Sequence, residues 1–113
     1  MMVLGERVIG VIDLYINVNH EVAELKYGMD PAHWGKGLMP EATRSLLGWC
    51  FGERQLAKVY ARVDARNSRS LKIVEKQGMT REGVLHSHIE RQEERIDDVY
   101  HGVLRDEWGA ARA

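Results

Sequence analysis

The sequence has 113 residues, with 16 Lys and Arg against 17 Asp and Glu and a formal net charge of −1. This length is enough for a single domain, residues 1–113, and the balanced charge gives no basic stripe of the kind that nucleic-acid-binding proteins use. A single cysteine, Cys50, excludes an internal disulfide framework and a thiolate zinc site. Because no apolar stretch is long enough to cross a bilayer, we expect a soluble, cytoplasmic protein that binds neither nucleic acid nor membrane.

Alternating apolar and polar side chains predict strands in the first part of the chain. A short apolar piece, residues 1–4, and a longer one, residues 8–16, are expected to form a hairpin, and both faces of the longer strand are substantially apolar. Turn-forming residues at 17–20 lead into a further strand, residues 21–29, which has one polar edge. We therefore expect a cleft beside this strand.

Helical and strand patterns alternate in the rest of the chain. The predicted elements are a helix over residues 38–51, a strand over 58–64, a helix over 68–77 that Asn67 caps, and strands over 79–85 and 95–104. The apolar side of the first helix comprises Leu38, Ala42, Leu46, Trp49 and Cys50. The order strand, helix, strand implies a right-handed crossover between parallel neighbours. Residues 86–94 are predicted to be a charged connection, and residues 105–113 a short tail that frays unless Trp108 packs.

The stretch of residues 30–42 joins a strand to a helix and contains Gly35 and Gly37. Backbone N–H groups at such a helix N-terminus favour a bound anion. A Walker-type phosphate loop is excluded because Lys36 is followed by glycine rather than Ser or Thr, and a dinucleotide fingerprint would need a third glycine where Pro40 stands. A diphosphate-binding loop and an ordinary strand-to-helix turn remain as alternatives.

Short motifs follow one another in a fixed order along nearly the whole chain. They occupy residues 9–12, 23–27, 34–42, 62–64, 67–70, 75–79, 81–85 and 104–108. In this order they resemble the GCN5-related N-acetyltransferase (GNAT) superfamily, and within it most closely the ribosomal-protein N-terminal acetyltransferases.

This resemblance implies an α/β GNAT acyl-CoA N-acyltransferase fold, a mixed sheet with two helices. It implies transfer of an acetyl group from acetyl-CoA to a primary amine, such as a protein N-terminus or a small amine. The strands over 21–29 and 58–64 would splay apart to admit pantetheine, and the glycine loop would hold the pyrophosphate. The residues that the resemblance assigns to cofactor binding are Leu25, Tyr27, Gly28, Met29, Trp34, Gly35, Lys36, Gly37, Leu38, Met39 and Asn67.

The chain departs from the family pattern in two ways. Family members carry another strand and two helices before the point where this chain starts, so we expect exposed sheet surface that a second copy covers in a homodimer. The tyrosine that acts as general acid in many members is replaced by Val74, whereas Ser70 matches the serine of the ribosomal subfamily. Its partnering acid is replaced by Ile89, which makes Glu24 the candidate base, acting through water. The alternative is that Glu24 is an ordinary solvent-facing carboxylate.

The shortened acceptor side leaves a second function open, a non-catalytic acyl-CoA-binding or structural oligomer that is a remnant of the fold. His86, His88 and His101 would form a three-histidine cluster only if their segments approach one another. Surface histidines commonly bind nothing, so we expect no metal site. Cys50 lies on the apolar side of its helix and is expected to pack in the core.

Overall fold

The computed structural model describes residues 2–4, 7–29 and 37–112. The strands in this part of the chain are β1 (Met2–Leu4), β2 (Arg7–Asn17), β3 (Val22–Met29), β4 (Lys58–Asp64), β5 (Thr80–Arg91) and β6 (Glu94–Leu104). The helices are α1 (Leu38–Gly52), α2 (Ser68–Lys76) and α3 (Arg105–Arg112). The sequence pattern predicts the strands and the first two helices in this order, and the structure adds α3.

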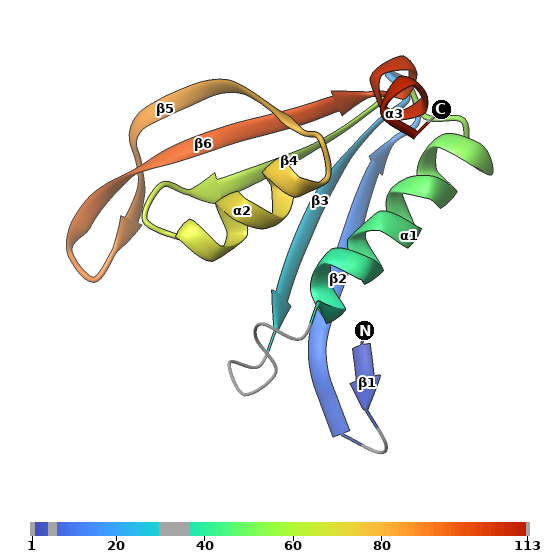
Figure 1. Ribbon diagram of the computed structural model, residues 1–113. Helices are drawn as coiled ribbons and strands as arrows, with labels where there is room; N and C mark the ends of the chain where they lie inside the picture. The colour runs from blue at the N-terminus through green and yellow to red at the C-terminus, as the bar shows by residue number, and fades with distance from the viewer. Residues whose placement is uncertain (1, 5–6, 30–36, 113) are drawn as a thin grey trace.

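The strands form one six-stranded mixed sheet in the order β1-β2-β3-β4-β6-β5 (Figure 1). β3 and β4 run parallel, as the strand–helix–strand order predicts, and every other neighbouring pair is antiparallel. The mixed sheet with its helices confirms the predicted α/β class.

The core lies between one face of the sheet and the two long helices. Alternate residues of the central strands are buried, among them Leu25 of β3 and Val59 of β4, and they pack with Leu47 of α1 and Val74 of α2. The partly buried Leu14 of β2 lies opposite Leu25 and packs against the same cluster. Both helices cover this face of the sheet (Figure 1). The opposite face carries the alternating, more polar set of side chains.

The buried face of α1 is shifted by one position along the chain from the predicted face, and the two share only Cys50. The buried positions are Met39, Thr43, Leu47, Cys50 and Phe51, and Trp49 is 42% exposed. The error arises because the polar Thr43 interrupts the series that faces the sheet, which hides this series from a search for apolar spacing. Cys50 packs in the core as expected, and burial raises the pKa of its thiol to about 11.

The last two strands are longer than the sequence predicts. β5 runs to Arg91 through the span that was expected to be a charged connection. Its register shifts so that the residues between Leu85 and Ile89 lie opposite the single Asp97 of β6, and one carboxylate oxygen of Asp97 accepts the N–H of Ser87 at 2.9 Å. Polar residues on an exposed edge strand give no alternating pattern, so a bulged strand is hard to distinguish from a loop.

The C-terminal segment is a helix rather than a fraying tail. Trp108 is 9% exposed, and its ring lies 5.7 Å from that of Phe51. At the start of α3, a carboxylate oxygen of Glu107 accepts the N–H of Leu104 at 2.8 Å. The helix is therefore held by contacts to a residue far away in the sequence and by a local hydrogen bond at its first turn.

Residues 2–4, 7–29 and 37–112 contain neither a membrane-spanning helix nor a group of side chains arranged to bind a metal. None of their helices has the length and apolar character that crossing a bilayer requires. No group of three His, Cys, Asp or Glu side chains among them is arranged to hold a metal ion. Of the three histidines considered above, His101 is buried and His86 is exposed.

Candidate active site

The parallel ladder between β3 and β4 is short. It consists of four residue pairs, from Val22 opposite Lys58 to Leu25 opposite Ala61. Beyond these pairs β3 continues along β2 and β4 continues along β6, so the two strands diverge (Figure 1). Past Leu25, the edge of β3 that faces β4 has no ladder with another described strand, so its backbone N–H and C=O groups could pair with an extended ligand. The divergence agrees with the splay that the resemblance implies.

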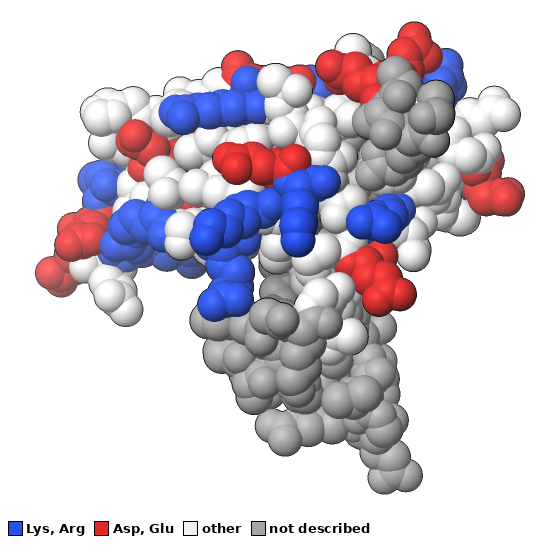
Figure 2. Space-filling model, in the orientation of Figure 1, with Lys and Arg blue, Asp and Glu red and all other residues white. Residues whose placement is uncertain are grey.

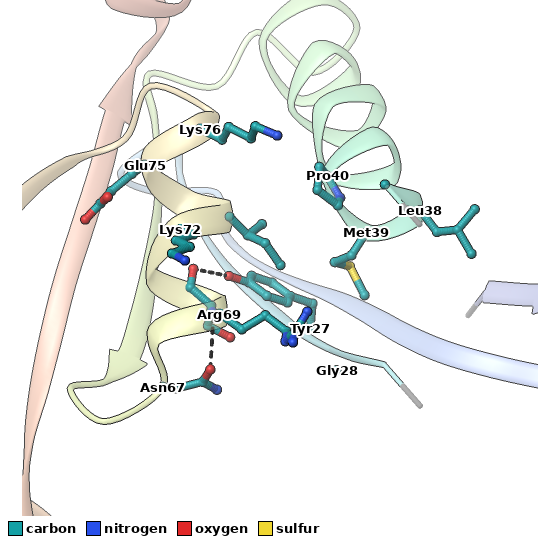
Figure 3. A pocket seen from close by; sticks show the side chains of 13 residues that line it. Tyr27, Gly28, Leu38, Met39, Pro40, Asn67, Arg69, Lys72, Glu75 and Lys76 are labelled. Atoms are coloured by element: carbon teal, nitrogen blue, oxygen red, sulfur yellow. Dashed lines mark hydrogen bonds between the residues drawn. The ribbon is translucent and has the colours of Figure 1, made fainter. Parts of the chain in front are cut away.

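A cavity of about 770 Å³ lies beside the end of β3, between the start of α1 and the side of α2 (Figure 3). We refer to it as the helix-side cavity. It is lined by Tyr27, Gly28, Gly37, Leu38, Met39, Pro40, Asn67, Arg69, Ser70, Lys72, Ile73, Glu75 and Lys76. Its lining therefore combines the end of a strand, a helix N-terminus and one side of a second helix.

The N-terminus of α1 is suited to an anion. Gly37 precedes the helix in the left-handed conformation, with φ of 74°, and no side chain caps the first turn. The N–H groups of Leu38 and Met39 are among the first-turn donors that an α-helix leaves without an intrahelical partner. Pro40 has no N–H to satisfy. The helix dipole adds positive potential at the same end, so a phosphate placed there would be stabilised.

One side of α2 adds positive charge to the helix-side cavity. Arg69, Lys72 and Lys76 are spaced three and four residues apart, which places them on one side of the helix, and all three line the cavity. Figure 2 shows basic side chains gathered over α2, and Figure 3 shows Lys76 extending toward α1. Lys72 and Lys76 are not among the site residues predicted from the sequence. Their spacing together with Arg69 is the sequence signal that could have identified the basic side.

Ser70 is held in place by two hydrogen bonds to its backbone. The phenolic O–H of Tyr27 donates to the Ser70 carbonyl oxygen at 3.0 Å, and the Ser70 N–H donates to the side-chain oxygen of Asn67 at 3.0 Å (Figure 3). The second bond is the N-cap of α2, as predicted. Burial raises the pKa of Tyr27 to about 12, so its hydroxyl stays protonated and remains a donor at neutral pH.

A second cavity, of about 440 Å³, lies on the other side of the strand gap, and we refer to it as the sheet-side cavity. It is lined by Glu24, Leu25, Lys26, Tyr27, Arg62, Val63, Asp64, Asn67, Ser70, Ile89, Arg91 and Asp98. Tyr27, Asn67 and Ser70 line both cavities. The two cavities therefore meet at the point where β3 and β4 separate, and a ligand in one could react with a ligand in the other.

Glu24 reaches the sheet-side cavity from β3. Its Oε2 atom is buried and has no hydrogen-bond partner in the described residues. Glu24 lies opposite Tyr60 of β4, and burial, followed by the charge of Glu24, raises the pKa of Tyr60. A buried carboxylate oxygen without a partner is costly to maintain unless a water molecule or a ligand supplies a hydrogen bond.

An ion pair between the partly exposed Arg62 and the buried Asp98 lines the sheet-side cavity together with Glu24. The Nε and Nη2 atoms of Arg62 donate to Asp98 Oδ2 at 2.9 and 2.7 Å, and Asp98 is 1% exposed. This hydrogen bonding raises the pKa of Arg62. The guanidinium also lies 5.4 Å from the centre of the Tyr100 ring, which in turn stacks on Tyr60. Sequence reasoning missed this group, because the pairing of β4 with β6 brings its members together from distant positions.

The predicted site residues fall into three groups. Glu24, Leu25 and Ser70 line the sheet-side cavity. Tyr27, Gly28, Gly37, Leu38, Met39 and Asn67 line the helix-side cavity, and Met29 ends β3 beside it. Trp34, Gly35 and Lys36 lie outside the described residues. Ile89, which stands in the place of the expected acid, lines the sheet-side cavity, and Val74 is buried in the core.

Two neighbouring strands that splay apart are what the GNAT resemblance implies, and comparison with known proteins agrees with that family. Residues 1–80 match the family described as Acetyltransferase (GNAT) domain, and the chain belongs to this family. It is 35% identical over 86 residues to "Probable N-acetyltransferase YjcK" of Bacillus subtilis, covering 74% of this chain and 48% of that protein. It is 34% identical over 82 residues to a spermidine N(1)-acetyltransferase of Escherichia coli, covering 72% and 44%.

A solved structure of mutant forms of the spermidine/spermine N-acetyltransferase SpeG from Vibrio cholerae superimposes with a TM-score of 0.87 at 25% identity. The match covers 96% of this chain and 63% of that one. The chain thus spans about half the length of the curated relatives it matches. Because spermidine acetyltransferases are among these relatives, the finer assignment to the ribosomal-protein subfamily stays a prediction.

Proposed function

We propose that this domain transfers an acetyl group from acetyl-CoA to a primary amine. The observation that carries the proposal is the meeting of two cavities at Tyr27, Asn67 and Ser70, where the sheet opens. Acetyl transfer needs two substrates to approach from different sides while the reacting atoms meet at one point. The named relatives, which are N-acetyltransferases, support the same reaction class.

The helix-side cavity fits the chemistry of acetyl-CoA. Its phosphates would lie against the uncapped N-terminus of α1 and the basic side chains of α2, Arg69, Lys72 and Lys76. The pantetheine arm carries amide groups, which match the open backbone edge of β3 beyond Leu25. When bound, acetyl-CoA supplies an activated thioester carbonyl. The fit therefore combines an anion site at one end with a backbone edge that can pair with amides.

Glu24 and Ser70 would move the protons of this reaction. An amine with a pKa of roughly 8 to 10 is mostly an ammonium ion at neutral pH and must lose a proton before it attacks. The unpartnered Oε2 of Glu24 would accept this proton through a water molecule. The amine nitrogen then bonds to the carbonyl carbon and the C–S bond breaks. The hydroxyl of Ser70, whose backbone is held by Tyr27 and Asn67, would donate a proton to the departing thiolate and regain one, through water, from the nitrogen as the amide forms.

Calorimetry with acetyl-CoA, followed by measurement of CoA release with a set of amines, tests the proposal. We expect binding and amine-dependent release, with Glu24→Gln and Ser70→Ala each lowering kcat by about 10²-fold or more and leaving acetyl-CoA binding intact. Glu53→Gln, a change at an exposed glutamate at the end of α1, is the matched control. Binding without release would instead support the alternative function, a non-catalytic acyl-CoA-binding remnant. A failure to bind acetyl-CoA would contradict both.

We propose further that the domain is a homodimer in the cytoplasm. The observation in favour is apolar surface on the side of β2 away from the helices, where Val11 is 43% and Tyr15 is 56% exposed. Burying such a face against a second copy would remove it from water. Light scattering should then report about twice the 12.9 kDa mass of the chain. A stable monomer would refute the dimer without affecting the proposed chemistry.

A further inference from the structure

The sheet-side cavity is lined by equal numbers of acidic and basic side chains. The acids are Glu24, Asp64 and Asp98, and the bases are Lys26, Arg62 and Arg91. Contacts within the protein neutralise some of these charges, so the lining does not present all of them to a ligand. The charges left over determine which kind of acceptor the cavity can hold.

Two of the acids are already paired. Asp98 accepts two N–H groups of Arg62, at 2.9 and 2.7 Å, and is buried beneath it. Asp64 Oδ1 accepts the backbone N–H of Arg66 at 2.8 Å and lies 3.7 Å from the Arg66 side chain. Each carboxylate therefore already has an arginine beside it, which weakens its attraction for a positive charge on a ligand.

Three charged groups remain, one negative and two positive. Glu24 keeps a buried carboxylate oxygen without a partner. Lys26 is exposed and lies opposite Asp13 of β2, but it forms no ion pair with the described residues, and its Nζ atom lies 5.2 Å from the centre of the Tyr15 ring. Arg91 is exposed, and its side chain forms no hydrogen bond or ion pair with the described residues, since Glu94 opposite it pairs with Arg66. The cavity thus offers one negative group, Glu24, to a ligand's cation and two positive groups, Lys26 and Arg91, to a ligand's anion.

We propose that the acceptor is a small amine that also carries an anionic group, a carboxylate or a phosphate. This inference rests on the proposed function and adds the class of acceptor. The reacting amine lies toward Glu24, and the anionic group lies toward Lys26 and Arg91. An α-amino acid and a phosphorylated amino alcohol both have this arrangement of charges.

Acceptors with several amines fit the same cavity poorly. A diamine or polyamine would place its second ammonium group among Lys26, Arg62 and Arg91, without a free carboxylate beyond Glu24 to receive it. Like charges in a partly enclosed site repel one another and suppress binding of the wrong partner. The chain would in this respect differ from those relatives whose names specify spermidine.

A panel of matched amines tests this class. CoA release would be measured at saturating acetyl-CoA with 4-aminobutyrate, O-phosphoethanolamine, butylamine and 1,4-diaminobutane. We expect kcat/KM for at least one of the two anionic amines to exceed that for the diamine by about tenfold, with butylamine between them. The carboxylate and phosphate compounds then show which anion is preferred.

Variants at Lys26 and Arg91 test whether these two cations select the anionic group of the acceptor. Arg91→Gln and Lys26→Gln should each lower kcat/KM for the preferred anionic amine about fivefold more than kcat/KM for butylamine, the effect of a partly exposed ion pair. Arg91→Glu should raise kcat/KM for the diamine. Arg81→Gln removes an exposed arginine of the same strand that lies outside both cavities, and serves as the control.

The outcomes separate this inference from the proposed function. If CoA is released with amines but the diamine is preferred, or if Arg91→Gln affects all amines equally, the acceptor class is wrong while the acetyltransferase function stands. If no amine causes release although acetyl-CoA binds, both the acceptor class and the transfer reaction are refuted.

Discussion

The ion pair of Arg62 and Asp98, which lines the sheet-side cavity, allows a sharp test of how much this contact contributes to the stability of the fold. Replacing Arg62 by Met keeps an unbranched side chain over the Tyr100 ring but removes both donors to Asp98 Oδ2. Asp98 is 1% exposed, so its carboxylate would be left buried without its cation. Removing one member of a fully buried pair typically costs about 3–5 kcal/mol.

The expected cost here is lower, because 35% of the Arg62 side chain is exposed and solvent screens part of the charge. We expect Arg62→Met to lower the free energy of unfolding by about 2 kcal/mol, which for a chain of this length corresponds to a fall in Tm of about 8 °C. The double variant Arg62→Met with Asp98→Leu removes the stranded charge and should recover most of the loss, to within about 1 kcal/mol of the original protein.

Urea denaturation followed by circular dichroism measures these differences, provided that the slope of the unfolding free energy against urea concentration stays constant. Arg44→Met, a change at an exposed arginine of α1, is the control and should stay within about 0.5 kcal/mol of the original protein. The reasoning is refuted if Arg62→Met changes stability no more than the control does, or if the double variant is less stable than the single one.

Three other predictions concern the fold. Burial is the main cause that lowers the pKa of His101 in the folded protein. Below about pH 6.5 the unfolded chain therefore binds a proton at this histidine more readily than the folded chain does. The free energy of unfolding should fall on acidification from pH 7.5 to 5.5. His101→Gln should flatten this dependence in denaturation measured at both pH values. Gly48→Ala, inside α1, should raise the free energy of unfolding by about 0.5–1 kcal/mol. Gly37→Ala, at φ of 74°, should lower the free energy of unfolding by about 1 kcal/mol. Trp108→Ala should cost about 3 kcal/mol and speed amide hydrogen exchange in α3.

Each of these has an outcome that would contradict it. An exposed histidine, His20, gives the control for the pH series, because His20→Gln should leave the slope of stability against pH unchanged. Equal effects of alanine at Gly37 and Gly48 would show that backbone conformation does not decide the difference. Unchanged exchange in α3 after loss of Trp108 would mean that its contact with Phe51 does not hold the helix.

The parts of the fold that the sequence predicts are those with strong local periodicity. The bounds of β4 match the prediction, because Val59, Ala61 and Val63 alternate with polar residues. The buried side of α1 could not be read correctly, since it includes Thr43. The formation of α3 depends on Phe51, a residue more than fifty positions away from its start, and no local pattern carries that information.

The candidate site divides in the same way. Ordered motifs led to Glu24 and Ser70, and the structure brings both to one cavity. Asp98 and Arg62 were missed, because each looks like an ordinary strand residue until the β4–β6 register places them together. Residues that act as neighbours across a sheet are defined by strand pairing, which a single sequence specifies only weakly.

The short, four-pair ladder between β3 and β4 affects how cooperatively the whole domain unfolds. It is the one strand-to-strand connection, within the described strands, between the group β1-β2-β3 and the group β4-β6-β5. A molecule that pairs with the edge of β3 beyond Leu25 and also contacts α2 would add contacts between these two groups of strands, where the described strands themselves have only the four-pair ladder. Occupancy at a hundredfold excess over Kd would add about 2.7 kcal/mol to stability. It should also make the two groups of strands unfold more cooperatively, which amide exchange along β3 and β4 would register as joint protection.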